Sequence, residues 1–286
     1  MNKVKIITDS CCSLSTAELE RMDVDWAQMT IMIDGELYNA YEHPTKDPDK
    51  FYNNLKSVKK CSTGCVNIQT FTDLFEKWAH NGYDVVYMGL SSGLSSTYDN
   101  AMHAAEHVNK TCGKHIWVAD TLSGSFGIAY MVQHACKLAA EGKSAEEIYN
   151  AINKNKLRTI CYFMPLDLQF LANCGRLNKI VAGVGTMLKL VPILANNEEG
   201  KLKMIAKSIG RKKALKTLQS LILNTADLNK AEKIYIGHTG QAAEAELMAD
   251  FIKQNTQNKD VEVGWLDYTM GCSCGPNTLA VFVSLK

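Results

Sequence analysis

The first half of the chain alternates short apolar runs with stretches in which apolar residues recur at helical spacing. Three such runs, at residues 4–8, 84–90 and 115–120, each end in a polar loop that leads into a helical pattern. Repeated strand–helix units of this kind are typical of an α/β fold with a parallel sheet. The pattern therefore predicts an N-terminal α/β domain, residues 1–155, in which helices flank a parallel sheet.

The second half of the chain loses this regular alternation after residue 155. Strand-like and helix-like segments follow one another in mixed order, which indicates an α+β domain over residues 156–286. The expected strands lie at residues 159–164, 191–195, 203–208, 234–237, 261–267 and 279–284, and the expected helices at 166–173, 212–224 and 242–255. Because the chain has only 5 prolines and no Pro-rich linker, we expect the two domains to pack tightly.

Charge and hydropathy exclude several classes of protein. The chain has 31 lysines and arginines against 30 aspartates and glutamates, a net charge of +1, whereas nucleic-acid-binding proteins usually carry a basic excess or a basic face. No segment reaches the ~18 uninterrupted apolar residues that a membrane span needs. We therefore expect no nucleic-acid partner and no stable membrane insertion.

The cysteines and the first residues favour a cytoplasmic location. The 10 cysteines are irregularly spaced and several lie inside apolar runs such as residues 160–163, which is typical of reduced thiols and not of a disulfide framework. The N-terminal segment reaches Asp9 without the long apolar core of a secretory signal. Both features predict a protein of the reducing cytoplasm.

Three loops of the first half, at residues 8–10, 91–97 and 121–125, are rich in hydroxyl residues and glycine. Because the carboxyl ends of parallel strands meet at one edge of a sheet, these loops should together line a ligand crevice. Hydroxyls beside the amides of a helix start suit a carboxylate or a phosphate. Each loop alone is more simply explained as a helix N-cap, but three at one edge favour an anion site. The P-loop motif is absent.

Metal sites are less well supported by the spacing of possible ligands. His103, Glu106 and His107 match the H-x-x-E-H pattern of a zinc enzyme, but the apolar face of the same helix would leave both histidines towards solvent. The cysteine pairs at residues 61 and 65 and at 272 and 274 lack the C-x2-C spacing of structural zinc sites. We therefore expect neither a metal nor another cofactor.

Two further readings of the sequence remain open. Ser92, Asp9 and His238 could form the triad of a serine-type hydrolase acting on a small acyl ester, although Ser92 is not in a G-x-S-x-G elbow. A basic run at residues 201–216, which contains Arg211, is either a solvated strand edge and helix end or a docking face for a charged partner.

Phrases along nearly the whole chain resemble the DegV family of bacterial fatty-acid-binding proteins. The most specific one is Leu-Ser-Ser-Gly-Leu-Ser at residues 90–95. The other phrases are Ile-Thr-Asp-Ser at 7–10, Ile-Asp-Gly-Glu-Leu-Tyr at 33–38, Cys-Gly-Arg-Leu at 174–177, Val-Pro-Ile-Leu at 191–194, Gly-Arg-Lys-Lys-Ala at 210–214 and Gly-Pro at 275–276.

This resemblance implies a two-domain lipid-binding carrier that is not itself an enzyme. One long-chain fatty acid is expected to lie with its carboxylate in the crevice between the domains and its tail in an apolar tunnel of the C-terminal domain. The carrier would present the acid to a fatty acid kinase subunit, which phosphorylates the carboxylate.

Matching motifs also identify the expected contact residues. Arg211 falls where the family has a basic residue implicated in the kinase encounter, and Ser273 stands where the family usually has a histidine that faces the carboxylate. The family's T-S-Q-P-S phrase is mostly replaced after Thr63. The expected ligand-binding residues are Thr63, Ser92, Gly93, Leu94, Ser95 and Ser273.

Overall fold

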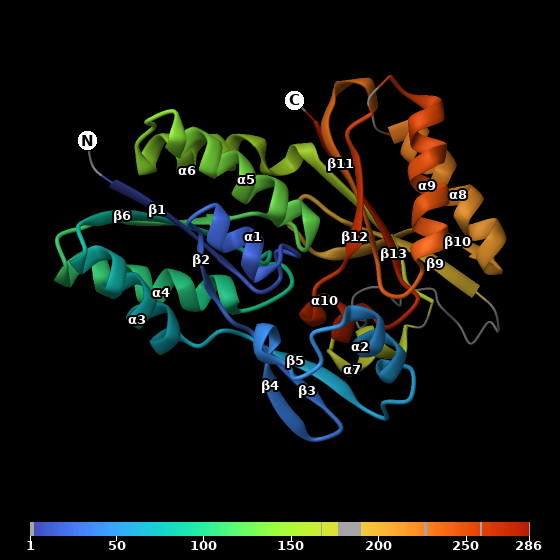
Figure 1. Cartoon of the computed structure of the whole chain (residues 1–286), viewed down its shortest axis with the longest axis horizontal. Helices are drawn as coiled ribbons and strands as arrows, with labels where there is room; N and C mark the ends of the chain where they lie inside the picture. Colours follow the sequence, from blue (N-terminus) through green and yellow to red (C-terminus); the bar gives the residue numbers. More distant parts are fainter. Residues whose placement is uncertain (1–2, 167, 177–189, 226–227, 258, 286) are drawn as a thin grey trace.

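The computed structural model describes residues 3–166, 168–176, 190–225, 228–257 and 259–285 (Figure 1). It contains a four-stranded sheet, a three-stranded sheet and a six-stranded sheet, all accompanied by helices. The α/β class predicted from the sequence is confirmed. Within the described residues, no helix is both long enough and apolar enough to cross a bilayer.

The four-stranded sheet is parallel throughout and contains the three predicted N-terminal strands. Its order is β2-β1-β6-β7, and helices cover both faces: α3 and α4 lie on one side and α5 and α6 on the other (Figure 1). The strands are β1 (Lys3–Asp9), β2 (Asp25–Ala27), β6 (Tyr83–Gly89) and β7 (Ile116–Asp120). The helices are α1 (Thr16–Arg21), α3 (Ile68–His80), α4 (Thr97–Thr111), α5 (Phe126–Ala140) and α6 (Ala145–Asn155).

A small antiparallel sheet extends from this half of the protein. It contains β3 (Thr30–Ile33), β4 (Glu36–Asn39) and β5 (Cys61–Gly64) in the order β4-β3-β5. Asp34 and Gly35 both have positive φ, 49° and 94°, as the tightest hairpin turn between two strands requires. The chain continues through η1 (Ala40–Glu42) and α2 (Pro48–Leu55) before it returns to β5.

The six-stranded sheet forms the second half of the protein in the order β10-β9-β8-β13-β11-β12. Neighbouring strands are antiparallel except β11 and β12, which are parallel. The strands are β8 (Thr159–Met164), β9 (Leu190–Asn196), β10 (Leu202–Ile209), β11 (Ala231–His238), β12 (Val261–Trp265) and β13 (Leu279–Leu285). The helices are η2 (Lys156–Arg158), α7 (Gln169–Asn173), α8 (Arg211–Thr225), η3 (Leu228–Lys230), α9 (Ala242–Asn255) and α10 (Tyr268–Cys274).

Most predicted elements of this half are present, with two corrections. The predicted strand at 261–267 ends at Trp265 because the Asp267 side chain accepts a hydrogen bond from the amide of Met270 and so begins α10. The predicted helix at 166–173 begins only at Gln169. The proposed boundary between domains coincides with the end of α6 at Asn155; the division into domains 1–155 and 156–286 stays a prediction.

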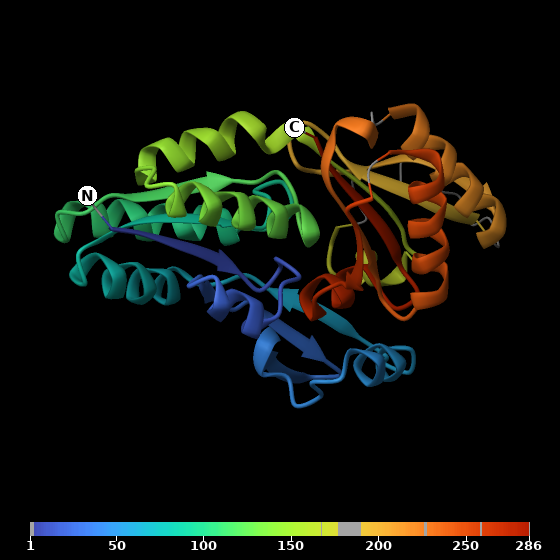
Figure 2. The same ribbon diagram turned by 45° about the horizontal axis from the view of Figure 1, so that its top comes forward.

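Alternating residues of the six-stranded sheet pack into two different apolar cores, one on each face of the sheet. On β8, Tyr162 and Met164 pack with α8 and α9, whereas Phe163 belongs to the same apolar core as the N-terminal half. Helix α5 lies against this near face (Figure 2). There the ring of Phe126 stacks on Tyr235 at 4.8 Å between centroids. One apolar core therefore runs from the parallel sheet to the near face of the second sheet.

A buried tyrosine joins the two halves of the protein by hydrogen bonds. The hydroxyl of Tyr52 donates to the carbonyl oxygens of Leu266 and Asp267 at 2.6 and 3.0 Å. Replacing Tyr52 by phenylalanine leaves both buried carbonyls without this donor, so we expect the free energy of unfolding to fall by about 1–3 kcal/mol. Chemical denaturation measures it, and Tyr38→Phe, which removes an exposed hydroxyl bonded to Glu36, is the control. Equal losses in the two variants would contradict the prediction.

Candidate functional site

A cavity lies between the loops at the carboxyl ends of the parallel strands and the near face of the six-stranded sheet. About 760 Å³ of space between the atoms lies here, part of it open to solvent. Three groups of residues line it: Leu90, Leu94 and Ser125 from the loops, Thr269 and Ser273 from α10, and Phe163, Ala280 and Phe282 from the sheet.

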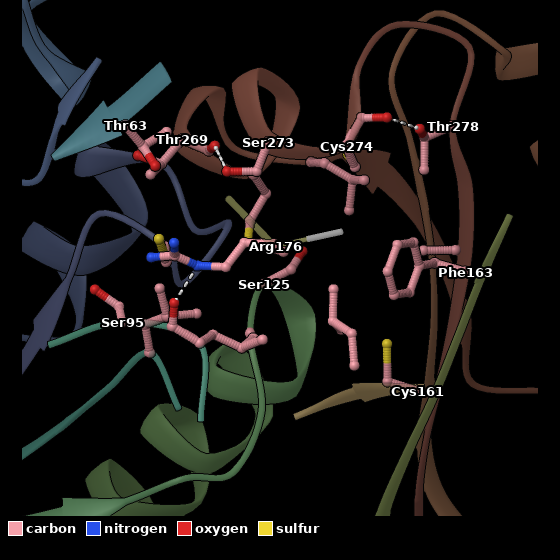
Figure 3. Close-up of a pocket in the computed structure, with 18 of the residues that line it drawn as sticks. Thr63, Ser95, Ser125, Cys161, Phe163, Arg176, Thr269, Ser273, Cys274 and Thr278 are labelled. Carbon is pink, nitrogen blue, oxygen red and sulfur yellow. Dashed lines mark hydrogen bonds between the residues drawn. The ribbon is translucent and has the colours of Figure 1, made fainter. Parts of the chain in front are cut away.

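Polar side chains gather at one end of this cavity. Figure 3 shows the guanidinium of Arg176 between Ser95 on one side and Thr63, Thr269 and Ser273 on the other. Arg176 donates hydrogen bonds from Nε to the carbonyl of Leu94 and from Nη1 to that of Cys174, the latter at 2.7 Å. Among the described residues that line the cavity, Arg176 is the one with a charged side chain. The two carbonyls fix this cation at the polar end.

The hydroxyl groups at this end of the cavity differ in the hydrogen bonds that they already form within the protein. Ser273 donates to the carbonyl of Thr269 at 3.1 Å, and Ser95 accepts from the amide of Thr97 at 3.2 Å. Burial raises the pKa of the Cys174 thiol, while hydrogen bonds with Ser273 and Thr63 oppose this rise. The hydroxyl of Thr63 therefore has a thiol as its neighbour, which is a weak hydrogen-bonding group, and not a backbone carbonyl. This hydroxyl is well suited to bind a ligand.

The opposite end of the cavity is apolar. Cys161 and Phe163 lie there, away from Thr63 and Ser95 (Figure 3), and β13 adds Ala280 and Phe282. Burial raises the pKa of Cys161 to about 12, so this thiol is neutral near pH 7. A cavity with one cation and hydroxyls at one end and apolar side chains at the other suits an amphiphile with an anionic head.

The sequence-predicted ligand residues fall into two groups. Thr63, Leu94, Ser95 and Ser273 line the cavity. Ser92 and Gly93 do not; they line a neighbouring pocket at the surface. The carboxylate of Asp120 accepts from both the hydroxyl and the amide of Ser92, at 2.5 and 3.2 Å, which turns Ser92 away from the cavity.

The amides expected to bind the carboxylate already have acceptors in the turn after β6. The Gly93 amide donates to the hydroxyl oxygen of Ser91 at 3.1 Å, and the Leu94 amide donates to the Ser91 carbonyl at 3.0 Å. Gly93 also packs closely on the loop at residues 199–200, where a Cβ atom would lie 2.5 Å from the carbonyl oxygen of Glu199. Side chains, and not these amides, face the cavity.

Arg211 lies apart from the cavity, at the first position of α8. Its side chain is about one-fifth exposed and forms an ion pair with Glu244 at 2.6 Å. Its Nη1 also donates to the carbonyl of Asn277 at 2.8 Å. Arg211 therefore connects α8 with α9 and with the loop before β13.

The three residues of the hydrolase alternative do not form a triad in the described structure. The carboxylate of Asp9 accepts from the amides of Cys11 and Leu90 and from the hydroxyl of Tyr87. The imidazole of His238 accepts from the amide of Gly240 and contacts Trp265, and Ser92 donates to Asp120. Each of the three side chains thus has partners elsewhere.

The candidate metal ligands are likewise separated. Within the described ranges, no group of three or more histidine, cysteine or acidic side chains has a geometry that could hold a metal ion. His107 lies 3.8 Å from Glu76. Cys61 and Cys272 are both buried, whereas Cys274 lines the cavity and Cys65 is exposed.

Arg176 and Thr269 are cavity residues that the sequence did not assign to the site, and Ser125 was expected there only as part of the loop at residues 121–125. The Cys-Gly-Arg phrase indicates a change of chain direction before Arg176, because a glycine after a helix commonly redirects the chain. In the structure Gly175 has a φ of 69° where α7 ends. The direction of the arginine side chain depends on the carbonyls of Leu94 and Cys174, which only the fold brings near it.

Comparisons with known proteins agree with this fold over the whole chain. The model of the DegV family, described as uncharacterised proteins, matches residues 3–286. A DegV domain-containing protein of Clostridium perfringens is 32% identical over 284 residues, which cover 99% of this chain and 97% of that protein.

Solved structures give the same result. A fatty acid binding DegV family protein from Streptococcus agalactiae has a TM-score of 0.88 at 26% identity, with 100% of each chain covered. A DegV family protein from Eubacterium eligens, loaded with heptadecanoic acid, has a TM-score of 0.84 at 25% identity, covering 99% of this chain and all of that one. The chain therefore belongs to the DegV family.

Proposed function

We propose that this protein binds a long-chain fatty acid, with the carboxylate beside Arg176 and the tail along the apolar end of the cavity. The observation that carries the proposal is the polarity of the cavity: its one described cation lies at the hydroxyl-rich end, and sheet residues line the other end. The heptadecanoic acid of the Eubacterium eligens relative supports the same class of ligand.

The energetics of each end fit such a ligand. A buried carboxylate is very unfavourable unless it is paired and hydrogen-bonded, and a guanidinium with flanking hydroxyls provides both kinds of partner. Each buried methylene of the tail contributes about 0.8 kcal/mol. The head group would therefore determine the orientation of the fatty acid in the cavity, and the tail would contribute most of the affinity. Thr63, Ser95 and Ser273 are the hydroxyls that we assign to the head group.

We further propose that the protein is a carrier and not an enzyme of fatty acid metabolism, and that it presents the acid to a fatty acid kinase subunit. In this proposal residues 1–155 supply Thr63 and Ser95 to the head group, and residues 156–286 supply Arg176, Ser273 and the apolar wall of the tunnel. A reducing cytoplasm would suit the cysteines, all ten of which are free.

Mass spectrometry of an organic extract of the purified protein tests the proposed ligand. A cavity with an apolar end should retain an acyl chain from the expression host, so we expect about one fatty acid per chain. An extract without acyl chains, together with no binding of added fatty acids by calorimetry, would overturn the proposal.

Thr63 and Ser92 should differ in their effect on binding. Thr63→Val removes a hydroxyl that lines the cavity, and a hydrogen bond to a charged group is worth roughly 1.5–3 kcal/mol, or about one to two decades in Kd. Ser92→Ala removes a hydroxyl bonded to Asp120 outside the cavity, so we expect less than about a two-fold change. Titration with a fluorescent fatty acid measures both, and equal losses would contradict this assignment.

Arg211 provides a test of the kinase encounter. If Arg211 docks the kinase, Arg211→Ala should slow transfer of phosphate to the bound acid by about ten-fold without changing the Kd of the acid. Glu244→Gln is the matched control, because it breaks the same ion pair but keeps the cation. Equal losses of transfer in both variants would mean that Arg211 acts by holding α8 to α9, and would contradict docking.

A further inference from the structure

Ser125 is a polar residue in the part of the cavity that a fatty acid tail would cross. The residue is fully buried and lines the cavity. In the view of Figure 3 it lies between the guanidinium of Arg176 and the ring of Phe163. A saturated tail has no group that forms a hydrogen bond, so a plain fatty acid makes no use of this hydroxyl.

The backbone of Ser125 adopts a conformation that favours glycine. Its φ and ψ are 54° and −131°, and its amide donates to the carbonyl of Cys11 at 2.7 Å. Residues other than glycine rarely adopt these angles, and such strain is concentrated at functional sites. A glycine would relieve the strain, so the serine side chain must have a use of its own here.

A chain of hydrogen bonds fixes the direction of the Ser125 proton. The Ser13 hydroxyl donates to Oδ2 of Asp267 at 2.6 Å and accepts from the Asp267 amide at 3.0 Å. The hydroxyl oxygen of Ser125 lies 2.7 Å from that of Ser13. Because a hydroxyl has one proton and two lone pairs, Ser13 has only a lone pair left for this contact. Ser125 therefore donates to Ser13.

This direction holds while Asp267 is ionised. Burial raises the pKa of Asp267 to about 7, although hydrogen bonds from Ser13 and from the amide of Met270 oppose the rise. At about pH 8 the group is therefore mostly a carboxylate, which accepts hydrogen bonds and donates none. The Ser13 proton then stays on Asp267, and the Ser125 proton stays on Ser13.

Ser125 has only lone pairs left for a ligand in the cavity. Within the described part of the chain, Ser13 is the hydrogen-bonding partner of the Ser125 hydroxyl. Thr278 also lines the cavity (Figure 3), and its hydroxyl likewise uses its proton within the protein, donating to the carbonyls of Cys274 and Gly275 at 3.0 and 3.1 Å. Both hydroxyls therefore act as acceptors towards the cavity, and a ligand satisfies them with a donor.

We propose that this cavity recognises a hydroxy fatty acid, whose chain hydroxyl donates a hydrogen bond to Oγ of Ser125. The inference rests on the proposed function, because it takes the carboxylate to lie beside Arg176. A hydroxyl is an uncharged donor that an acyl chain can carry. An oxo group on the same carbon is an acceptor only, and Ser125 has no proton left for it.

The environment of Ser125 makes this discrimination measurable. A hydroxyl that is buried in an apolar tunnel without a hydrogen bond weakens binding by about ten-fold or more. The acceptor at Ser125 removes most of that loss. A hydroxy acid should therefore bind about as tightly as the plain acid, whereas the oxo acid should bear the full loss.

Calorimetry at about pH 8 tests the inference in the wild-type protein. The probes are stearic acid, its 10-hydroxy and 12-hydroxy derivatives and the corresponding 10-oxo and 12-oxo acids. We expect one hydroxy acid to bind within about three-fold of stearic acid and about ten-fold more tightly than its oxo counterpart. If stearic acid binds but neither hydroxy acid binds more tightly than its oxo counterpart, the inference is overturned and the proposed function stands. If no probe binds, both are overturned.

A variant of Ser125 assigns the effect to this residue. Ser125→Gly should lower the affinity for the preferred hydroxy acid by about ten-fold and leave that for stearic acid within about two-fold. Glycine tolerates the positive φ, and thermal melting verifies that the variant folds. Ser92→Ala is the matched control, because it removes a serine hydroxyl that bonds to Asp120 outside the cavity; it should change neither affinity. Equal losses of both acids in Ser125→Gly would contradict recognition of a hydroxyl.

Discussion

Replacing Arg176 by methionine will weaken the binding of a long-chain fatty acid by about 100-fold. Methionine keeps a long unbranched side chain but removes the one charge that the described cavity wall presents. Removing one partner of a buried charge pair costs about 2–5 kcal/mol, because the remaining charge is left desolvated and unpaired. Isothermal titration of the acid against both proteins at pH 7 measures the loss.

Two controls separate the charge of Arg176 from its packing. A fatty alcohol of the same length has no charge, so its affinity should be nearly equal in wild type and Arg176→Met. Arg176→Lys keeps the charge but cannot reproduce the fixed fork that donates to Leu94 and Cys174, so we expect an intermediate loss. If acid and alcohol weakened equally in Arg176→Met, the carboxylate would not lie at this end.

The strands of the two large sheets other than the three-residue β2 could be predicted, most readily those that are buried. Strands covered on both faces read as continuous apolar runs, as β1, β6 and β13 do. The small sheet was not predicted, since its strands have only four residues each and only β3 contains three apolar residues in a row. Helix α10 has only seven residues with two cysteines and a glycine, so it shows no amphipathic period, and only the capping residue Asp267 marks its start.

The position of the site could be predicted, but the direction of its side chains could not. The loops at residues 91–97 and 121–125 do flank the cavity, as expected for the carboxyl edge of a parallel sheet. Within one loop, however, Ser95 faces the cavity while Ser92 bonds to Asp120. The direction of the Ser92 side chain depends on Asp120, which lies at the end of the neighbouring strand β7. Likewise, no residue pattern by itself predicts that Ser125 has a positive φ, 54°.

The second large effect is expected at the apolar end of the cavity. Cys161 lies on β8, away from Arg176, and its small thiol leaves room beside Phe163 and Phe282. A phenylalanine at position 161 should exclude about three methylenes of a bound tail, each worth about 0.8 kcal/mol. We therefore expect Cys161→Phe to weaken binding of an 18-carbon acid by about 60-fold and to leave a 10-carbon acid nearly unaffected, as measured by calorimetry with both acids.

Cys161→Ala is the matched control, because it removes the thiol without filling the cavity. It should bind the 18-carbon acid within about three-fold of wild type, since the buried thiol is neutral and contributes little beyond packing. Added bulk in a packed wall can also cost about 1–3 kcal/mol of stability, so thermal melting of both variants must accompany the titrations. Equal weakening of the two acids by Cys161→Phe would mean that the tail does not reach β8, and the orientation with the carboxylate at Arg176 would have to be reversed.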